Sequence, residues 1–200
     1  MQTVSIPRDR SQVIVNDFVR SVYNWMALGL ALTGIIAFYV AHSESLMKLI
    51  YGNQLIFWGL IIGELVLVFS ISGRITKMSA QTATGLFLLY SALNGATLSF
   101  VFLAYSGTSI ARVFFITAGT FAVCSVYGMT TKRDLTSLGG FLFMGLVGII
   151  IASVVNMFIR SDAMTLIISY IGVIVFVGLT AYDTQRIKEM ALSRPAGRFY

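Results

Sequence analysis

An acidic residue lies in the middle of a long apolar run in the first half of the chain. Glu64 occurs in the sequence Gly-Leu-Ile-Ile-Gly-Glu-Leu-Val-Leu-Val. A carboxylate at the centre of a bilayer costs about 3 kcal/mol or more unless it is protonated, paired or hydrated. Such residues usually belong to an ion path or a proton relay, which is the interpretation we favour. The alternative is a neutral acid that is hydrogen-bonded to a neighbouring helix.

Two more charged residues lie at the ends of apolar runs. Asp183 ends the last run, and Arg186 follows it at helical contact spacing. Arg74 ends the second run. Asp183 could simply face water, and Arg74 could be an interfacial anchor. The alternative is an ion pair between Arg74 and Asp183 that ties two helices together. Glu64 cannot reach Arg74 directly, because their separation of ten residues spans about 15 Å of helix.

Familiar catalytic patterns are missing from the sequence. It contains no phosphate-binding Gly-rich loop, no Gly-x-Ser-x-Gly elbow and no His-Glu-x-x-His metal motif. The single histidine, His42, has no histidine or cysteine beside it, and Cys124 lies alone in an apolar run. These residues do not supply the ligands of a zinc site. The sequence therefore predicts a protein that is not an enzyme and that has no cofactor.

The composition indicates that these residues are carried by membrane helices. Hydrophobic residues make up 57% of the chain and charged residues 11%, whereas soluble domains contain about 25% charged residues. The predicted fold is all-α, a polytopic bundle of six transmembrane helices, since no segment alternates with period two. We expect spans at residues 24–41, 55–73, 82–104, 110–129, 137–159 and 164–183. The domain boundaries follow: a cytoplasmic N-terminal arm at 1–22, the bundle at 23–185 and a polar C-terminal segment at 186–200.

The net charge of +6 predicts the orientation of the chain in the membrane. It does not indicate nucleic-acid binding, because the basic residues form short clusters between apolar runs. With the N-terminus in the cytoplasm, eleven basic residues lie on the cytoplasmic side, and they are Arg8, Arg10, Arg20, Arg74, Lys77, Lys132, Arg133, Arg186, Lys188, Arg194 and Arg198. Three, Lys48, Arg112 and Arg160, lie on the other side. This distribution follows the positive-inside rule.

Small and aromatic residues predict how the helices pack. Ser91, Gly95 and Ser99 repeat every four residues, a spacing that allows close approach of membrane helices. Tyr51 and other aromatic residues lie near the ends of the runs, where they would serve as interfacial anchors. Asn156 is expected to form a hydrogen bond between helices.

Two stretches of the sequence resemble one known family. The first begins Ser125-Val-Tyr-Gly-Met-Thr-Thr-Lys-Arg-Asp-Leu-Thr-Ser-Leu-Gly-Gly-Phe-Leu and continues to Asn156. The second is Phe-Val-Gly-Leu-Thr-Ala-Tyr-Asp-Thr-Gln, which ends at Gln185. Both, in this order and on six spans, resemble the Bax inhibitor-1 (transmembrane Bax inhibitor motif) family. The similarity covers nearly the whole chain and is greatest to members in the bacterial inner membrane, where we therefore expect this multi-pass protein.

The resemblance implies a calcium-leak channel that is gated by protonation. Members of the family are seven-helix bundles in which one aspartate from helix six and one from helix seven share a proton. Asp183 matches the helix-six aspartate, and Arg74 resembles the basic residue that latches to it in the closed pore. Glu64 is similar to an acid on the calcium route. Transient calcium binding at Glu64 and Asp183 would suit a cation that prefers oxygen ligands. The seventh helix and its aspartate are not in this sequence.

Two other functions are compatible with the sequence. The chain could be a non-conducting interaction protein that restrains another membrane protein, such as a membrane protease. The N-terminal arm would then be the contact, and replacement of Arg8 and Arg10 would matter. A proton-coupled transporter is a third possibility, which predicts saturable uptake and a substrate pocket.

Overall fold

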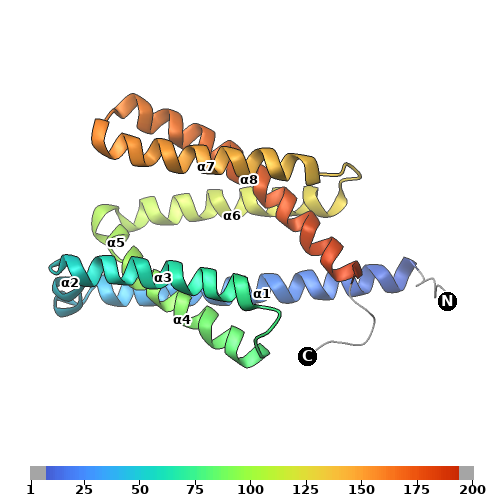
Figure 1. Ribbon diagram of the computed structural model, residues 1–200, viewed down its shortest axis with the longest axis horizontal. Coiled ribbons are helices and arrows are strands. Elements are labelled where there is room, and N and C mark those ends of the chain that lie inside the picture. The colour runs from blue at the N-terminus through green and yellow to red at the C-terminus, as the bar shows by residue number, and fades with distance from the viewer. Residues whose placement is uncertain (1–7, 194–200) are drawn as a thin grey trace. The chain divides into compact units, whose positions relative to one another are not determined.

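A computed structural model describes residues 8–193, with side chains from Val13 onward. These residues form eight helices and no strand (Figure 1). The helices are α1 (Arg8–Ala41), α2 (Glu44–Tyr51), α3 (Gln54–Arg74), α4 (Ala80–Leu98), α5 (Val101–Ala104), α6 (Gly107–Thr130), α7 (Thr136–Ile159) and α8 (Asp162–Ser193). The all-α architecture is therefore confirmed.

Six helical segments are long and apolar enough to cross a membrane, as predicted. They are Val13–Ala41, Gln54–Arg74, Ala80–Ala104, Gly107–Thr130, Thr136–Ile159 and Asp162–Ser193. The first helix begins at Arg8, so part of the predicted N-terminal arm is continuous with the first span. The last helix extends through residues 186–193 of the predicted polar segment. The rest of both predicted segments, including Arg194 and Arg198, lies outside the described residues.

Local sequence signals explain where two of the spans begin. The side chain of Asn53 accepts a hydrogen bond from the backbone N–H of Leu55 at 3.0 Å at the start of α3. Ser79 Oγ accepts one from the backbone N–H of Thr82 at 3.1 Å at the start of α4. These side chains pair N–H groups that have no partner inside their own helix. They fix the residues at which α3 and α4 begin, and α3 carries Glu64.

The described residues divide into two compact units. The central unit comprises residues 20–112, and the terminal unit comprises residues 8–19 and 113–193. In the central unit, α1 approaches α4 closely. Thr33 Oγ1 donates a hydrogen bond of 2.8 Å to the carbonyl of Ser91, and a Cβ at Gly95 would lie 2.6 Å from the carbonyl oxygen of Thr33. Ser91 and Gly95 of the predicted small-residue repeat thus mark a helix contact, as predicted.

The terminal unit is built on a close approach of α6 and α7 to α8. A Cβ at Gly128 would collide with the carbonyl of Ala181 and the side chain of Thr184. A Cβ at Gly139 would lie 2.6 Å from the ring of Tyr182. Asn156 donates to Thr165 Oγ1 at 2.8 Å between α7 and α8, which confirms its predicted role. Glycine thus lets these helices approach without the space that a side chain needs.

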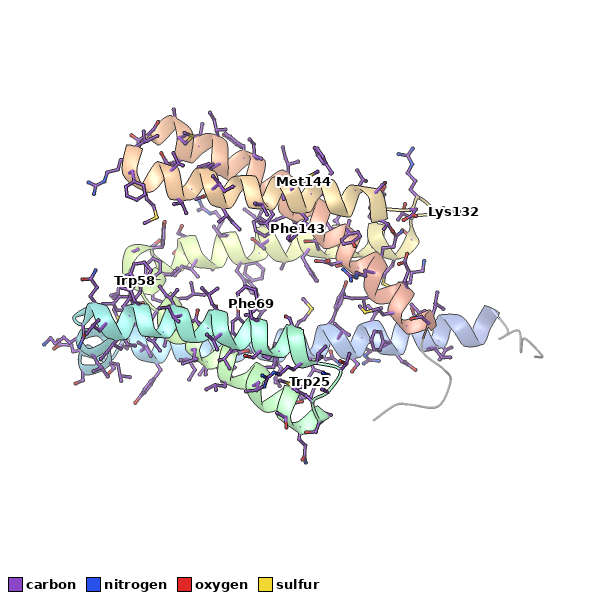
Figure 2. All side chains as sticks on the ribbon, in the orientation of Figure 1. Trp25, Trp58, Phe69, Lys132, Phe143 and Met144 are labelled. Carbon is purple, nitrogen blue, oxygen red and sulfur yellow. The ribbon has the colours of Figure 1, made fainter. Side chains whose placement is uncertain are left out.

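Large apolar side chains project outward from the helices. Phe143 and Met144 on α7 and Phe69 on α3 are 61–74% exposed, and Figure 2 shows them standing away from their own helices. In water such exposure would favour aggregation, but hydrocarbon is their natural surrounding. The protein therefore contacts lipid along its spans.

Candidate functional site

The central unit holds Glu64 in the middle of α3, ten residues after its first residue Gln54. Its carboxylate is half-buried, and Oε1 accepts a hydrogen bond of 2.8 Å from Thr97 Oγ1 on α4. Thr97 is only 8% exposed. The hydrogen bond pairs one carboxylate oxygen and leaves the group with further capacity to accept protons or bind a cation. A polar contact thus joins α3 to α4 within the span.

The third span is interrupted two residues beyond Thr97. Helix α4 ends at Leu98, and the short helix α5 begins at Val101, so Ser99 and Phe100 form a helix break. Ser99 is fully buried, and its Oγ donates to the carbonyl of Ala96 at 2.7 Å. Within a bilayer, backbone groups freed from a helix must find other partners.

Tyr51, the last residue of α2, supplies partners at the break. Its hydroxyl donates to the carbonyl of Thr97 at 2.8 Å and accepts a hydrogen bond from the backbone N–H of Phe100 at 3.3 Å. The sequence predicted Tyr51 as an interfacial anchor, and the structure gives it this second role. Local sequence could not indicate it, because Tyr51 and Thr97 are 46 residues apart.

Arg74 and Asp183 belong to different units, so the predicted ion pair would connect the units and stays a prediction. Arg74 is the exposed last residue of α3, and its carbonyl accepts hydrogen bonds from the backbone of Lys77 and Met78. Asp183 is exposed on α8, three residues before the exposed Arg186.

Asp183 precedes a buried polar contact between α8 and the turn that joins α6 to α7. Gln185 Oε1 accepts a hydrogen bond of 2.9 Å from the backbone N–H of Leu135, and its Nε2 donates to the carbonyl of Arg133 at 2.9 Å. Lys188 Nζ donates to the carbonyl of Met129 at 2.7 Å, near the end of α6. We call these contacts the turn clamp. It fixes the backbone of a turn that the sequence alone presents as plain charged surface.

The turn clamp also shows which signal in the sequence was missed. Gln185 is 8% exposed and shares one helix face with the buried residues Ala181, Thr184 and Ala191. Ala181 lies three residues before Thr184 and four before Gln185, and Ala191 lies seven after Thr184, which are spacings of one helix face. A glutamine on a face of small residues indicates a buried hydrogen bond, because a buried amide needs partners.

The same turn carries an exposed carboxylate with a shifted titration. Hydrogen bonds from the side chain and the backbone N–H of Thr136 hold the pKa of Asp134 below its ordinary value. The backbone bond to Asp134 Oδ1 is 2.8 Å long. Because the folded pKa is lowered, these bonds stabilise the turn at pH values above the ordinary pKa of about 3.9. The stabilisation is lost as the pH falls through the lowered pKa.

We expect Thr136→Val to raise the pKa of Asp134 towards its ordinary value, because the side-chain hydrogen bond to the carboxylate is lost. Thr136→Ser keeps a hydroxyl and should leave the pKa low. NMR titration of the Asp134 carboxyl carbon measures both variants. An unchanged pKa in the valine variant would show that the Thr136 hydroxyl is not the cause.

Among residues 8–193, no three histidine, cysteine or acidic side chains lie together as a metal-binding group. Glu64 and Asp183 each occur in a separate unit. Calcium binding at Glu64 and Asp183 stays a prediction, in which each residue would supply its carboxylate oxygens. Such oxygen ligands suit weakly held, hard cations.

Comparison with known proteins gives the family of this chain. Residues 15–196 match the family described as "Inhibitor of apoptosis-promoting Bax1". The chain belongs to the Bax inhibitor-1 family. The match contains Glu64, Arg74 and Asp183 and both stretches that carried the resemblance.

Relatives in the Bax inhibitor-1 family cover most of the chain. The inner membrane protein YbhL of Escherichia coli is 51% identical over 86% of this chain and 74% of its own length. An uncharacterized protein of Borreliella burgdorferi is 45% identical over 94% of this chain and 81% of its own. An uncharacterized membrane protein of Streptococcus pyogenes is 37% identical over 90% and 80%. No solved structure matches the chain.

Proposed function

We propose that this member of the Bax inhibitor-1 family is a pH-sensitive calcium leak of the bacterial inner membrane. It acts without catalysis and without a cofactor. In this proposal the N-terminus lies in the cytoplasm, as the distribution of basic residues predicts. Glu64 lies on the ion pathway, and Asp183 and Arg74 form the gate.

The proposal rests mainly on the surroundings of Glu64. A carboxylate in the middle of a span is costly. The hydrogen bond from Thr97 pairs Oε1, which is one of the two carboxylate oxygens of Glu64. If the residue served packing alone, a neutral side chain would achieve the same contact at lower cost. A carboxylate with unused oxygen ligands beside an interrupted helix is suited to receive a cation in transit.

Asp183 provides a means of gating. It is exposed and directly precedes Thr184 and Gln185, which are buried in the helix contacts of the terminal unit. A change in its charge would alter its attraction to Arg186 and to any basic partner such as Arg74. Protonation would thereby change which helix contacts are favoured.

Calcium flux into proteoliposomes tests the proposal. We expect flux that changes between about pH 6 and about pH 8, where shared or shielded carboxyl groups titrate. Asp183→Asn should remove this pH dependence, because the amide cannot ionise. Asp162→Asn is the matched control: Asp162 is exposed at the first turn of the same helix, and its replacement should leave the pH profile unchanged.

A folded protein that carries no calcium at any pH would contradict the leak. The interaction protein proposed from the N-terminal arm would then be the better explanation. Saturable uptake of a solute coupled to protons would instead indicate a transporter.

A further inference from the structure

The hydroxyl of Tyr51 lies within a small cluster of oxygen atoms at the helix break. It is 2.8 Å from the carbonyl oxygen of Thr97, 3.1 Å from Ser99 Oγ and 3.3 Å from the carbonyl oxygen of Ala96. We call these three atoms the oxygen cluster. A tyrosine hydroxyl has one hydrogen to donate, so it cannot satisfy all three at once. Ser99 Oγ already donates to the Ala96 carbonyl at 2.7 Å, so the acceptor capacity that remains unused lies on the Thr97 carbonyl and on Ser99 Oγ.

The oxygen cluster has the composition of a cation site. It lies at the carboxyl end of α4, where the helix dipole is negative. Carbonyl and hydroxyl oxygens are hard ligands, and interrupted membrane helices use such freed carbonyls to coordinate cations. The Tyr51 hydroxyl occupies the position among these oxygens at which a cation would be coordinated.

Thr97 connects the oxygen cluster to Glu64. Its carbonyl belongs to the cluster, and its Oγ1 donates to Glu64 Oε1. Tyr51 lies three residues before the start of α3, and Glu64 lies about 15 Å further along that helix. Polar groups of the central unit thus lead from the α2 end of α3 to its middle.

We propose that the helix break is the entrance through which a hard cation reaches Glu64 from the α2 side of the membrane, and that the Tyr51 hydroxyl closes it. Withdrawal of α2 would expose the oxygen cluster, which then replaces part of the hydration shell of the cation. The proposal rests on the cation leak proposed above and names its entrance. By the predicted orientation this entrance faces away from the cytoplasm.

Cysteine accessibility tests the entrance without a measurement of flux. Glu64→Cys is made with Cys124→Ala, since Cys124 is the one natural cysteine. Vesicles of either orientation are treated with a small cationic methanethiosulfonate. We expect Tyr51→Phe to increase the labelling rate about tenfold from the α2 side, or about 1.4 kcal/mol, the size of one hydrogen bond. Labelling from the opposite side should not change.

Tyr105→Phe is the matched control. Tyr105 is 59% exposed, and within residues 8–193 its hydroxyl forms no hydrogen bond, so its removal should not alter labelling. Equal labelling rates with Tyr51 and with phenylalanine would overturn the proposal. An equal increase in both phenylalanine variants would also overturn it, because the cause would be general loosening.

Calcium flux separates the entrance from the leak itself. If the protein conducts, Tyr51→Phe in the chain with Glu64 should raise the flux, and an unchanged flux would overturn the role of Tyr51. If no variant conducts but Tyr51→Phe accelerates labelling from the α2 side alone, the entrance is supported and the calcium leak is not.

Discussion

Glu64→Gln should lower the calcium flux into proteoliposomes at least about tenfold, or about 1.4 kcal/mol in the barrier. Glutamine has nearly the same shape and keeps an oxygen that can accept the hydrogen bond from Thr97 Oγ1. The helix contact should therefore persist, while the negative charge that attracts a divalent cation is removed. The flux at saturating calcium and the thermal stability are measured on the same preparation.

Glu44→Gln provides the control for Glu64→Gln. Glu44 lies on α2 in the same unit, and its side chain is exposed in a pair with Lys48 at 3.4 Å. Exposed pairs of this kind contribute at most about 1 kcal/mol to stability. We expect normal flux in this variant. Normal flux in both variants would remove Glu64 from the ion pathway and leave it a structural hydrogen-bond acceptor.

Gln185→Leu should break the turn clamp and raise the hydrogen exchange of the Leu135 amide about 100-fold, or about 2.7 kcal/mol. Leucine fills a similar volume but leaves the N–H of Leu135 and the carbonyl of Arg133 without their partner. A buried polar group without a partner costs about 1–3 kcal/mol. Exchange detected by mass spectrometry on the peptide that contains Leu135 gives the measurement.

Two further variants resolve the origin of this effect. Gln185→Glu can still accept from the Leu135 N–H but cannot donate to the Arg133 carbonyl when ionised, so we expect a smaller loss of protection. Gln81→Leu makes the same chemical change at an exposed position of α4 and should leave the turn unaffected. If the Leu135 amide exchanges no faster in Gln185→Leu than in the parent protein, the turn clamp does not hold the turn.

The sequence predicts the spans well because burial in lipid imposes a simple rule on composition. Each span must pair its backbone groups internally, so length and apolarity are sufficient to locate it. The ends are less predictable, because α1 and α8 extend beyond the apolar runs into polar sequence. Charged residues are compatible with a helix once it has left the hydrocarbon.

The candidate site was predictable only in part. Glu64 is identified by its type and depth alone, since an acid within an apolar run is costly wherever its neighbours lie. Its partner Thr97 and the helix break were not predicted, because Ser99 and Phe100 do not differ from ordinary residues of a membrane helix. Their role depends on Tyr51, which contacts them from another helix. Contacts between distant segments are decided by packing and leave little local trace.

The turn clamp has a consequence for the order in which the chain is made. Translation completes α6, α7 and their connecting turn before it reaches Gln185 and Lys188. Until then the N–H of Leu135 and the carbonyls of Met129 and Arg133 lack the partners that they have in the finished protein. The hairpin of α6 and α7 must therefore wait in the membrane with an unfinished turn. Insertion of α8 therefore completes the turn between α6 and α7, which was synthesised 50 to 59 residues earlier.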